Sequence, residues 1–220
     1  MWDRQRELAA ARKRNEIRDV LLLLEHAHVY TNGRSGRRED LLIDEAAQAR
    51  LRVSYLEVDR GGRITYHGPG QLVGYAIVDL ARLGLGVRTY VRRVEQVLVR
   101  TAAHFGVEAT TVPGLTGVWV ADGKLAAIGV KVSQTVTYHG FAINVDPDMS
   151  YFDHIVPCGI HGRSVTSLAR LLGRAVAVAE VVPVCAAAFA DVFGVELHWR
   201  ERGTPLSDDL GCSLGGTGRG

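Results

Sequence analysis

Apolar residues recur along this chain with two different spacings, and these spacings predict a mixture of helices and strands. Residues 87–105 have apolar side chains at a helical rhythm, and Gly106 follows as a residue that commonly ends a helix. Further helices are expected over residues 3–18, 41–49, 164–172 and 178–193, with Ser164 as the cap of the third of these. Short apolar runs bounded by turn residues predict strands over 20–25, 53–59, 72–80, 117–120, 124–132, 136–145 and 195–199.

The order of these elements indicates the fold class. Most predicted strands follow one another directly, and Asp122-Gly123 is typical of a hairpin turn between two of them. Consecutive hairpin strands with helices outside them favour an α+β fold, with a largely antiparallel sheet flanked by helices. Alternating strand and helix units are not dominant, which disfavours a Rossmann fold. We expect a single domain over residues 1–200 and a disordered tail, residues 201–220, rich in glycine, serine, aspartate and threonine.

The segment 59–71 is the densest group of turn residues in the chain, and predicted strands flank it on both sides. It contains Gly61, Gly62, Gly68 and Gly70, which allow backbone geometries that other residues resist and let a ligand lie against the main chain. A loop of this kind on a rigid scaffold is a usual place for binding chemistry. We therefore expect the segment to contact a ligand.

Composition limits the functional classes. Hydrophobic residues make up 47% of the 220 residues and charged residues 23%, as in ordinary globular proteins. The net charge of +2 gives no sign of nucleic-acid binding. The three cysteines are far apart and form no Cys-x-x-Cys pair, which disfavours a metal site and a disulfide framework. A charged start and short apolar runs disfavour a secretory signal and a membrane span, so a cytoplasmic location is predicted.

Cys158 is the candidate nucleophile, since Pro157 and Gly159 favour a tight turn around it. The alternative is a buried structural cysteine, the usual role of a lone cysteine in a cytosolic protein, and both interpretations stay open. Cys185 lies in an apolar run typical of a structural cysteine, and Cys212 lies in the predicted tail.

A nucleophilic cysteine needs a neighbouring base or cation to form its thiolate, and three residues are candidates. His161 is close in sequence, His139 precedes a glycine in a predicted strand, and Lys124 opens another predicted strand. Regular alternation would place Lys124 on the same face as Ala126 and Ile128, where a lysine is costly unless it has a role. A solvated lysine at the edge of a hairpin is the competing interpretation. His139 is kept as a candidate supporting residue.

Four motifs, taken in order, resemble those of one enzyme family. Arg60-Gly-Gly-x-x-Thr-Tyr-His-Gly-Pro-Gly-Gln71 is followed by Gly123-Lys-x-Ala-Ala-Ile-Gly129, His139-Gly-Phe-Ala-Ile-Asn144, and Pro157-Cys-Gly159 with Val165-Thr-Ser167. Over about residues 20–193 the chain is similar to the lipoyl(octanoyl) transferases, also called octanoyl-acyl carrier protein:protein octanoyltransferases. Ala76 is a small departure, at a position where that family often has proline.

The resemblance implies a fold shared with the catalytic domains of biotin protein ligases and lipoate ligases. It implies that Cys158 is the acyl-thioester nucleophile and Lys124 its partner, which makes His161 the weaker candidate. It also implies that the acyl chain is contacted by Arg60, Gly61, Gly62, Arg63, Ile64, Thr65, Tyr66, His67, Ala127, Ile128, Gly129, Gly140, Phe141 and Ala142.

The same resemblance implies the partners. The donor would be octanoyl-acyl carrier protein, and the acceptors would be the lipoyl domains of 2-oxoacid dehydrogenase E2 subunits and the glycine cleavage H protein. No ATP and no metal are expected.

Two alternatives remain open. The Gly33–Arg38 loop resembles the glycine and arginine loop that biotin ligases use around an adenylate, which would suit an ATP-dependent lipoate or biotin ligase. The same loop would also suit a phosphate or an acidic partner, although an exposed basic loop is the favoured interpretation. A module that only binds acyl chains is the non-enzymatic alternative.

Overall fold

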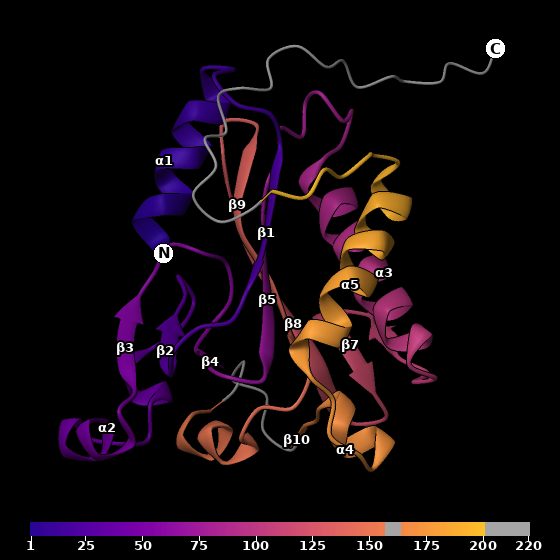
Figure 1. Cartoon of the computed structure of the whole chain (residues 1–220). Helices are drawn as coiled ribbons and strands as arrows, with labels where there is room; N and C mark the ends of the chain where they lie inside the picture. Colours follow the sequence, from indigo (N-terminus) through magenta and orange to yellow (C-terminus); the bar gives the residue numbers. More distant parts are fainter. Residues whose placement is uncertain (157–163, 201–220) are drawn as a thin grey trace.

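The structure, a computed structural model, describes residues 1–156 and 164–200, and the strands of these residues form two sheets (Figure 1). The strands are β1 (Val20–Leu24), β2 (Val29–Asn32), β3 (Ser54–Glu57), β4 (Thr65–His67), β5 (Gln71–Ile77), β6 (Thr110–Val112), β7 (Leu115–Val120), β8 (Gly123–Ser133), β9 (Val136–Asn144) and β10 (Ser164–Val165). The helices are α1 (Trp2–Lys13), α2 (Glu45–Leu51), α3 (Val87–His104), α4 (Leu168–Leu172) and α5 (Val178–Phe193), with 3-10 turns η1 (Arg38–Asp40) and η2 (Met149–His154).

The large sheet is almost entirely antiparallel. Its order within the described residues is β1-β5-β9-β8-β7-β6, and β10 adds a short parallel pairing with the beginning of β8. β8 and β9 form the longest hairpin, in register from Ala126 opposite Ile143 to Ser133 opposite Val136. The small sheet has the order β3-β2-β4, with β2 parallel to β3 and antiparallel to β4. The predicted α+β fold with a largely antiparallel sheet is confirmed.

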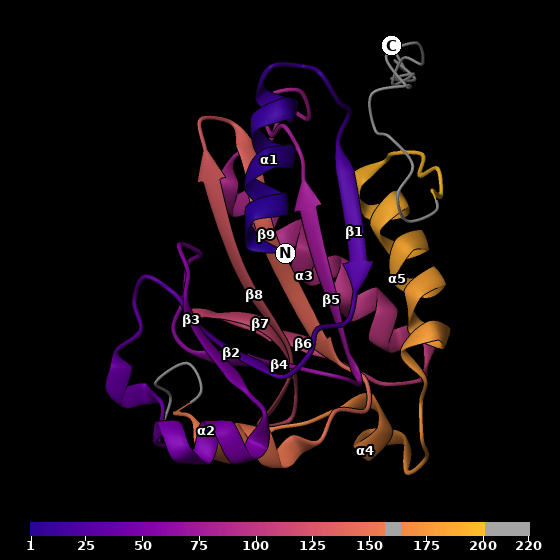
Figure 2. The same ribbon diagram turned by 60° about the vertical axis from the view of Figure 1, so that its left-hand side comes forward.

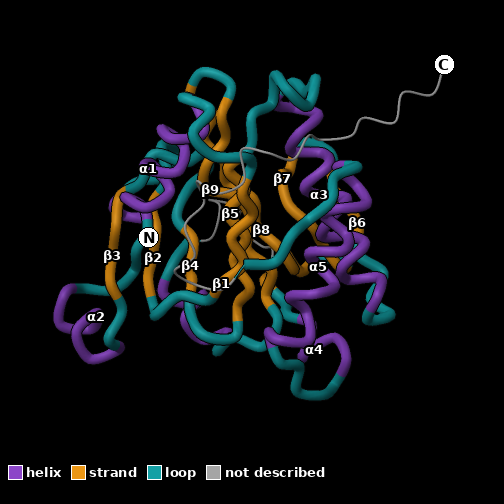
Figure 3. The backbone as a smooth tube through the Cα atoms, turned by 45° about the horizontal axis from the view of Figure 1, so that its top comes forward, coloured by secondary structure: helices purple, strands orange, loops and turns teal. Residues whose placement is uncertain are grey.

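Helices cover both faces of the large sheet. α3 and α5 pack against each other on one face, while α1 contacts β9 and β5 on the other (Figures 1 and 2). Figure 3 shows α3, α4 and α5 on the opposite side of the strands from α1 and α2. The small sheet lies on the same side of the large sheet as α1 (Figure 2).

Amphipathic helices supply the main core. α3 buries one stripe, which includes Tyr90, Val94, Val97 and Leu98, at the three- and four-residue spacing of a helical face. α5 is apolar over most of its length and adds Phe189 among others to the same core. Burial of this apolar area fixes both helices on the sheet, because it is the largest favourable term in folding.

Several predicted boundaries are confirmed and others are wrong. The helix predicted over 178–193 is observed with those limits, and the predicted hairpin between β7 and β8 is confirmed. Its turn is Ala121-Asp122 rather than Asp122-Gly123, because Gly123 already pairs with Val120. The opening helix ends at Lys13. The strand at 20–25 is half-buried rather than buried, because β1 is an edge strand of the sheet path.

Three predictions of local structure are wrong because tertiary pairing overrides local pattern. Ser164 does not cap a helix: it lies in β10, and Ser167 caps α4 by accepting a hydrogen bond from the N–H of Arg170. Residues 195–199 form no strand, although Val195 and Leu197 pack against the core. The helix predicted over 41–49 begins only at Glu45, behind the Asp44 cap. The predicted tail, residues 201–220, lies outside the described residues.

Candidate active site

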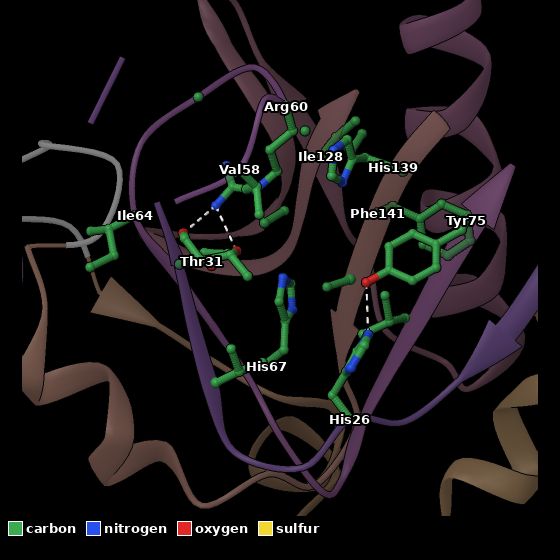
Figure 4. Close-up of a pocket in the computed structure, with 18 of the residues that line it drawn as sticks. His26, Thr31, Val58, Arg60, Ile64, His67, Tyr75, Ile128, His139 and Phe141 are labelled. Carbon is green, nitrogen blue, oxygen red and sulfur yellow. Dashed lines mark hydrogen bonds between the residues drawn. The ribbon is translucent and has the colours of Figure 1, made fainter. Parts of the chain in front are cut away.

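A cavity of about 450 Å³ lies between the two sheets. Its walls come from β5, β8 and β9 of the large sheet, from β2, β3 and β4 of the small sheet, and from the first residues of α1. Figure 4 shows His67 and Thr31 on the small-sheet side, facing Tyr75 and Phe141 on the large-sheet side. A cavity of this size is typical of a small-molecule site, and most of its lining is apolar or backbone.

The residues expected to contact an acyl chain meet in this cavity. Those that line it are Arg60, Gly62, Arg63, Ile64, Thr65, His67, Ala127, Ile128, Gly129, Gly140, Phe141 and Ala142. The motifs that supply them lie far apart in sequence. Antiparallel pairing brings two of the motifs together, because Ala127 lies opposite Ala142 and Gly129 opposite Gly140.

Two of the expected residues do not line the cavity. Gly61 is exposed, and its N–H donates to the carbonyl of Val130, which ties the glycine segment to β8. Tyr66 is fully buried behind the small sheet, where its hydroxyl lies 2.8 Å from Nδ1 of His28 and its ring stacks on Tyr151. In this structure both residues contact the elements around the cavity rather than the cavity itself. The interpretation of 59–71 as a loop is also incomplete, because it contains strand β4.

Lys124 lines the same cavity and is only 8% exposed. Its Nζ lies 4.7 Å from the centre of the Trp119 ring, a distance at which the aromatic face stabilises a cation. The alternation used to place it was wrong: Ala126 and Ile128 pack against the core that contains residues of α3 and α5, whereas Lys124 lines the cavity. A register shift in the β7–β8 ladder between Val118 and Trp119 accounts for the change of face.

Cys158 and His161 lie outside the described residues, but the residues on either side of segment 157–163 are placed. Before it, the N–H of Val156 donates to the carbonyl of Asp40 at 2.8 Å. After it, Val165 of β10 pairs directly with Lys124, and the N–H of Thr166 donates to the Lys124 carbonyl at 3.0 Å. The chain that leaves this segment therefore runs beside Lys124.

His139 lies at the far end of the cavity from β10. It has a left-handed backbone, with φ of 58°, and its Nε2 lies 2.9 Å from Oδ1 of Asp59. Burial lowers the pKa of His139, although its hydrogen bond to Asp59 opposes the shift, so the ring is neutral at neutral pH and its Nε2–H donates to the carboxylate. Burial alone would raise the pKa of Asp59. Hydrogen bonds from Tyr138, His139 and Trp2 lower it by more, so the net shift of the Asp59 pKa is downward.

Arg60 is buried and joins the glycine segment to β2. Its guanidinium donates to the carbonyl and hydroxyl of Thr31 and to the carbonyl of Gly61. Figure 4 shows two of these bonds at the upper edge of the cavity. The Gly33–Arg38 loop packs behind this wall, because Arg34 N–H donates to the Arg60 carbonyl at 3.0 Å. Whether that loop binds anything stays a prediction.

Sequence reasoning missed part of the site. His26, Thr31 and Tyr75 all line the cavity, and the ring nitrogen Nε2 of His26 lies 2.7 Å from the Tyr75 hydroxyl. His26 directly follows a predicted apolar strand, and Tyr75 lies within another. A polar side chain at either position was a usable signal of a site residue. The partnership of Asp59 with His139 had none, because these residues are eighty positions apart.

The described residues show neither a metal-binding cluster nor a membrane-spanning helix. Over residues 1–156 and 164–200, no group of three or more histidine, cysteine, aspartate or glutamate side chains is arranged to hold a metal ion. Across the same residues, the helices lack the length and apolar character that crossing a bilayer requires. The expected independence from metal and ATP, and the cytoplasmic location, stay predictions.

The fold is similar to solved lipoate ligases. A bipartite lipoate protein ligase from Thermoplasma acidophilum matches with a TM-score of 0.70 and 15% identity, over 89% of this chain and 81% of that one. A lipoate-protein ligase A solved with ATP matches with a TM-score of 0.69 and 15% identity, over 88% of this chain and 82% of that one. At such low identity the likeness concerns the fold alone, and it confirms the predicted similarity of fold to lipoate ligases.

Sequence comparison gives the family. The model of the lipoyl protein ligase A/B catalytic domain matches residues 1–190. A protein of Chloroflexus aurantiacus named octanoyltransferase is 51% identical over 198 residues, 89% of each chain. Another octanoyltransferase, from Koribacter versatilis, is 46% identical over 202 residues, 90% of this chain and 80% of that one. The chain therefore belongs to the lipoyl protein ligase A/B catalytic domain family and, within it, to the octanoyltransferases.

Proposed function

We propose that this octanoyltransferase takes octanoyl from octanoyl-acyl carrier protein and transfers it to a lysine of lipoyl domains, through a thioester on Cys158. The acceptors would be the lipoyl domains of 2-oxoacid dehydrogenase E2 subunits and the glycine cleavage H protein. The observation that carries the proposal is the meeting of Lys124 with the expected acyl-contacting residues in one cavity.

The cavity suits a medium-length acyl chain. Ala127, Gly129, Gly140 and Ala142 present small side chains or bare backbone, so an alkyl chain lies close to the sheet. Burial contributes ~0.8 kcal/mol per methylene, so an eight-carbon chain gains roughly 5 kcal/mol before binding costs. This gain is large enough for the depth of the cavity to select chain length.

The first step exchanges one thioester for another. The Cys158 sulfur attacks the octanoyl carbonyl carbon, and a new C–S bond forms as the C–S bond to the carrier arm breaks. The proton of Cys158 passes by way of Lys124 to the departing carrier thiolate. Bonds of the same kind are made and broken, so this step needs no ATP.

In the second step the amine of the acceptor lysine attacks the Cys158 thioester. A C–N bond forms, the C–S bond breaks, and the proton lost by the amine reaches the Cys158 sulfur by way of Lys124. An amide is more stable than a thioester, so the transfer runs downhill. The pairing of β10 with Lys124 supports this partnership, because β10 continues the segment that contains Cys158.

The decisive experiment omits nucleotide. The protein is incubated with octanoyl-acyl carrier protein and an apo lipoyl domain, and both products are followed by intact-mass spectrometry. We expect one octanoyl group on the protein, mapped to Cys158, and octanoylation of the lipoyl domain. Cys158→Ser should abolish the thioester, whereas a module that only binds acyl chains would keep its function. A strict requirement for ATP would overturn the proposal in favour of a ligase.

A further inference from the structure

A buried chain of side-chain amides connects β10 to the cavity. Asn144 Nδ2 donates to the carbonyl of Thr166 at 2.9 Å, and Gln71 Nε2 donates to Asn144 Oδ1 at 2.8 Å. Gln71 Oε1 then lies 2.7 Å from Nδ1 of His67. Asn144 and Gln71 are 5% and 2% exposed, so water has little access to them.

Two backbone carbonyls, those of Thr166 and Tyr66, fix the direction of every hydrogen bond in this chain. A backbone carbonyl only accepts, so Asn144 must turn its NH₂ group to Thr166 and its oxygen to Gln71. Gln71 must then present its NH₂ group, which also donates to the carbonyl of Tyr66 at 3.2 Å. Its oxygen is left facing His67. The His67 ring must therefore carry a proton on Nδ1, since an oxygen acceptor requires a donor.

The other ring nitrogen of His67 is left as an acceptor facing the cavity. Figure 4 shows the ring rising from β4 toward the middle of the cavity, between Thr31 and Tyr75. Burial lowers the pKa of His67 to about 3, although the bond to Gln71 opposes this shift. Charged or titratable neighbours lower it further: Arg60, His26 and His139. Lys124 lines the same cavity.

The same network holds Lys124. The N–H of Thr166 donates to the Lys124 carbonyl, while the carbonyl of Thr166 accepts from Asn144. One residue of the chain after β10 therefore fixes both the backbone of Lys124 and the start of the amide chain that orients His67. The acceptor nitrogen and the lysine are held by one rigid set of contacts, which is a requirement for orienting a reacting group.

We propose that Gln71 and Asn144 are positioning residues that lock His67 in its Nδ1–H form, so that Nε2 accepts a hydrogen bond from the attacking amine of the acceptor lysine. The inference rests on the proposed function. In the second step Cys158 is already acylated. Its octanoyl thioester carries no hydrogen-bond donor, whereas the attacking amine does. A neutral acceptor orients that amine without repelling its charge before attack.

The tautomer is tested directly on the full chain labelled with ¹⁵N. Long-range ¹H–¹⁵N spectra distinguish a protonated ring nitrogen from an unprotonated one, and His67→Phe assigns the resonances. We expect Nδ1 of His67 to be protonated and Nε2 unprotonated between pH 6 and 8 (roughly the range in which a free histidine titrates). A proton on Nε2, or titration of the ring within this range, would overturn the proposal. The protonation of the ring is read from the wild-type chain, and His67→Phe serves only the assignment.

The role is tested by separating the two half-reactions. Gln71→Met keeps the length of the side chain but removes both the acceptor and the donor, so the ring proton is free to occupy Nε2. Amide formation from the octanoylated enzyme should slow about tenfold, while loading from octanoyl-acyl carrier protein changes less than about twofold. Gln48→Met is the matched control, because Gln48 lies on α2 away from the cavity and should leave both half-reactions unchanged.

The outcomes separate this inference from the proposed function. Equal slowing of both half-reactions by Gln71→Met, or no slowing of either, would overturn the orientation of the amine by His67. Absence of any octanoyl adduct on wild-type Cys158 would instead overturn the proposed function, and the NMR result would still decide the tautomer.

Discussion

Ala142→Leu should shorten the acyl chain that the cavity accepts. Ala142 is 4% exposed, lines the cavity, and lies opposite Ala127, three residues along β8 from Lys124. At a rise of ~3.4 Å per residue, that pair is roughly 10 Å from the Lys124 backbone, close to the length of an extended octanoyl chain. A leucine at this position would therefore occupy the space of the last carbons of the chain.

The expected magnitude follows from the lost burial. If the leucine displaces about two methylenes, octanoyl loses ~1.6 kcal/mol of transfer free energy, which corresponds to about a 15-fold lower kcat/KM. A hexanoyl chain ends before the new side chain and should lose little. Extra volume also costs about 1–3 kcal/mol of stability where neighbours cannot move, so thermal unfolding is measured alongside.

The assay compares hexanoyl-, octanoyl- and decanoyl-acyl carrier protein as donors at saturating lipoyl domain. The ratio of kcat/KM for octanoyl over hexanoyl should fall about 15-fold in Ala142→Leu. Ala187→Leu makes the same change on the exposed surface of α5 and should leave the ratio unaltered. An equal loss for all three donors, or a shift of preference toward decanoyl, would refute the placement of the chain between β8 and β9.

Three further predictions concern catalysis, acid stability and packing. Lys124→Met keeps the aliphatic stem, so the melting temperature should change little. Because the variant lacks the amine, octanoyl transfer should fall at least ~100-fold. Near-normal transfer would exclude a proton-transfer role for Lys124. His67 has a pKa of about 3 in the folded chain, so the unfolded chain binds more protons between about pH 3 and ~6.5. The free energy of unfolding, measured by urea titration, should therefore fall by up to ~1.4 kcal/mol for each pH unit toward acid. A free energy of unfolding that does not change over this pH range would contradict the prediction. Gly140→Ala would place a Cβ 2.0 Å from the carbonyl oxygen of Gly74 and should lower stability by about 3 kcal/mol, whereas Gly86→Ala, with open space around it, should be tolerated in the same denaturation assay.

Local pattern determined the elements whose signals lie within a few neighbouring residues. The periodicity of α3 and α5 gave both helices, because each buries one apolar stripe that is legible in its own sequence. The β7–β8 hairpin was legible from the Asp-Gly turn signal between two neighbouring strands, and only its turn was misplaced by one residue. The residues expected to contact an acyl chain came from the family motifs, and the structure brings most of them into one cavity.

Tertiary structure decided everything that depends on a distant partner. β2 was missed and β4 was taken for loop, because short strands are stable only through pairing with each other and with β3. Residues 195–199 alternate correctly but find no strand to pair with among the described residues.

The electrostatic character of the site was likewise beyond the sequence. Asp59 beside His139, Trp119 beneath Lys124, and the amide chain that holds His67 all join residues brought together by folding. A sequence states which side chains are available, but protonation and orientation depend on burial and on hydrogen-bond partners, and those exist only once the two sheets have closed around the cavity.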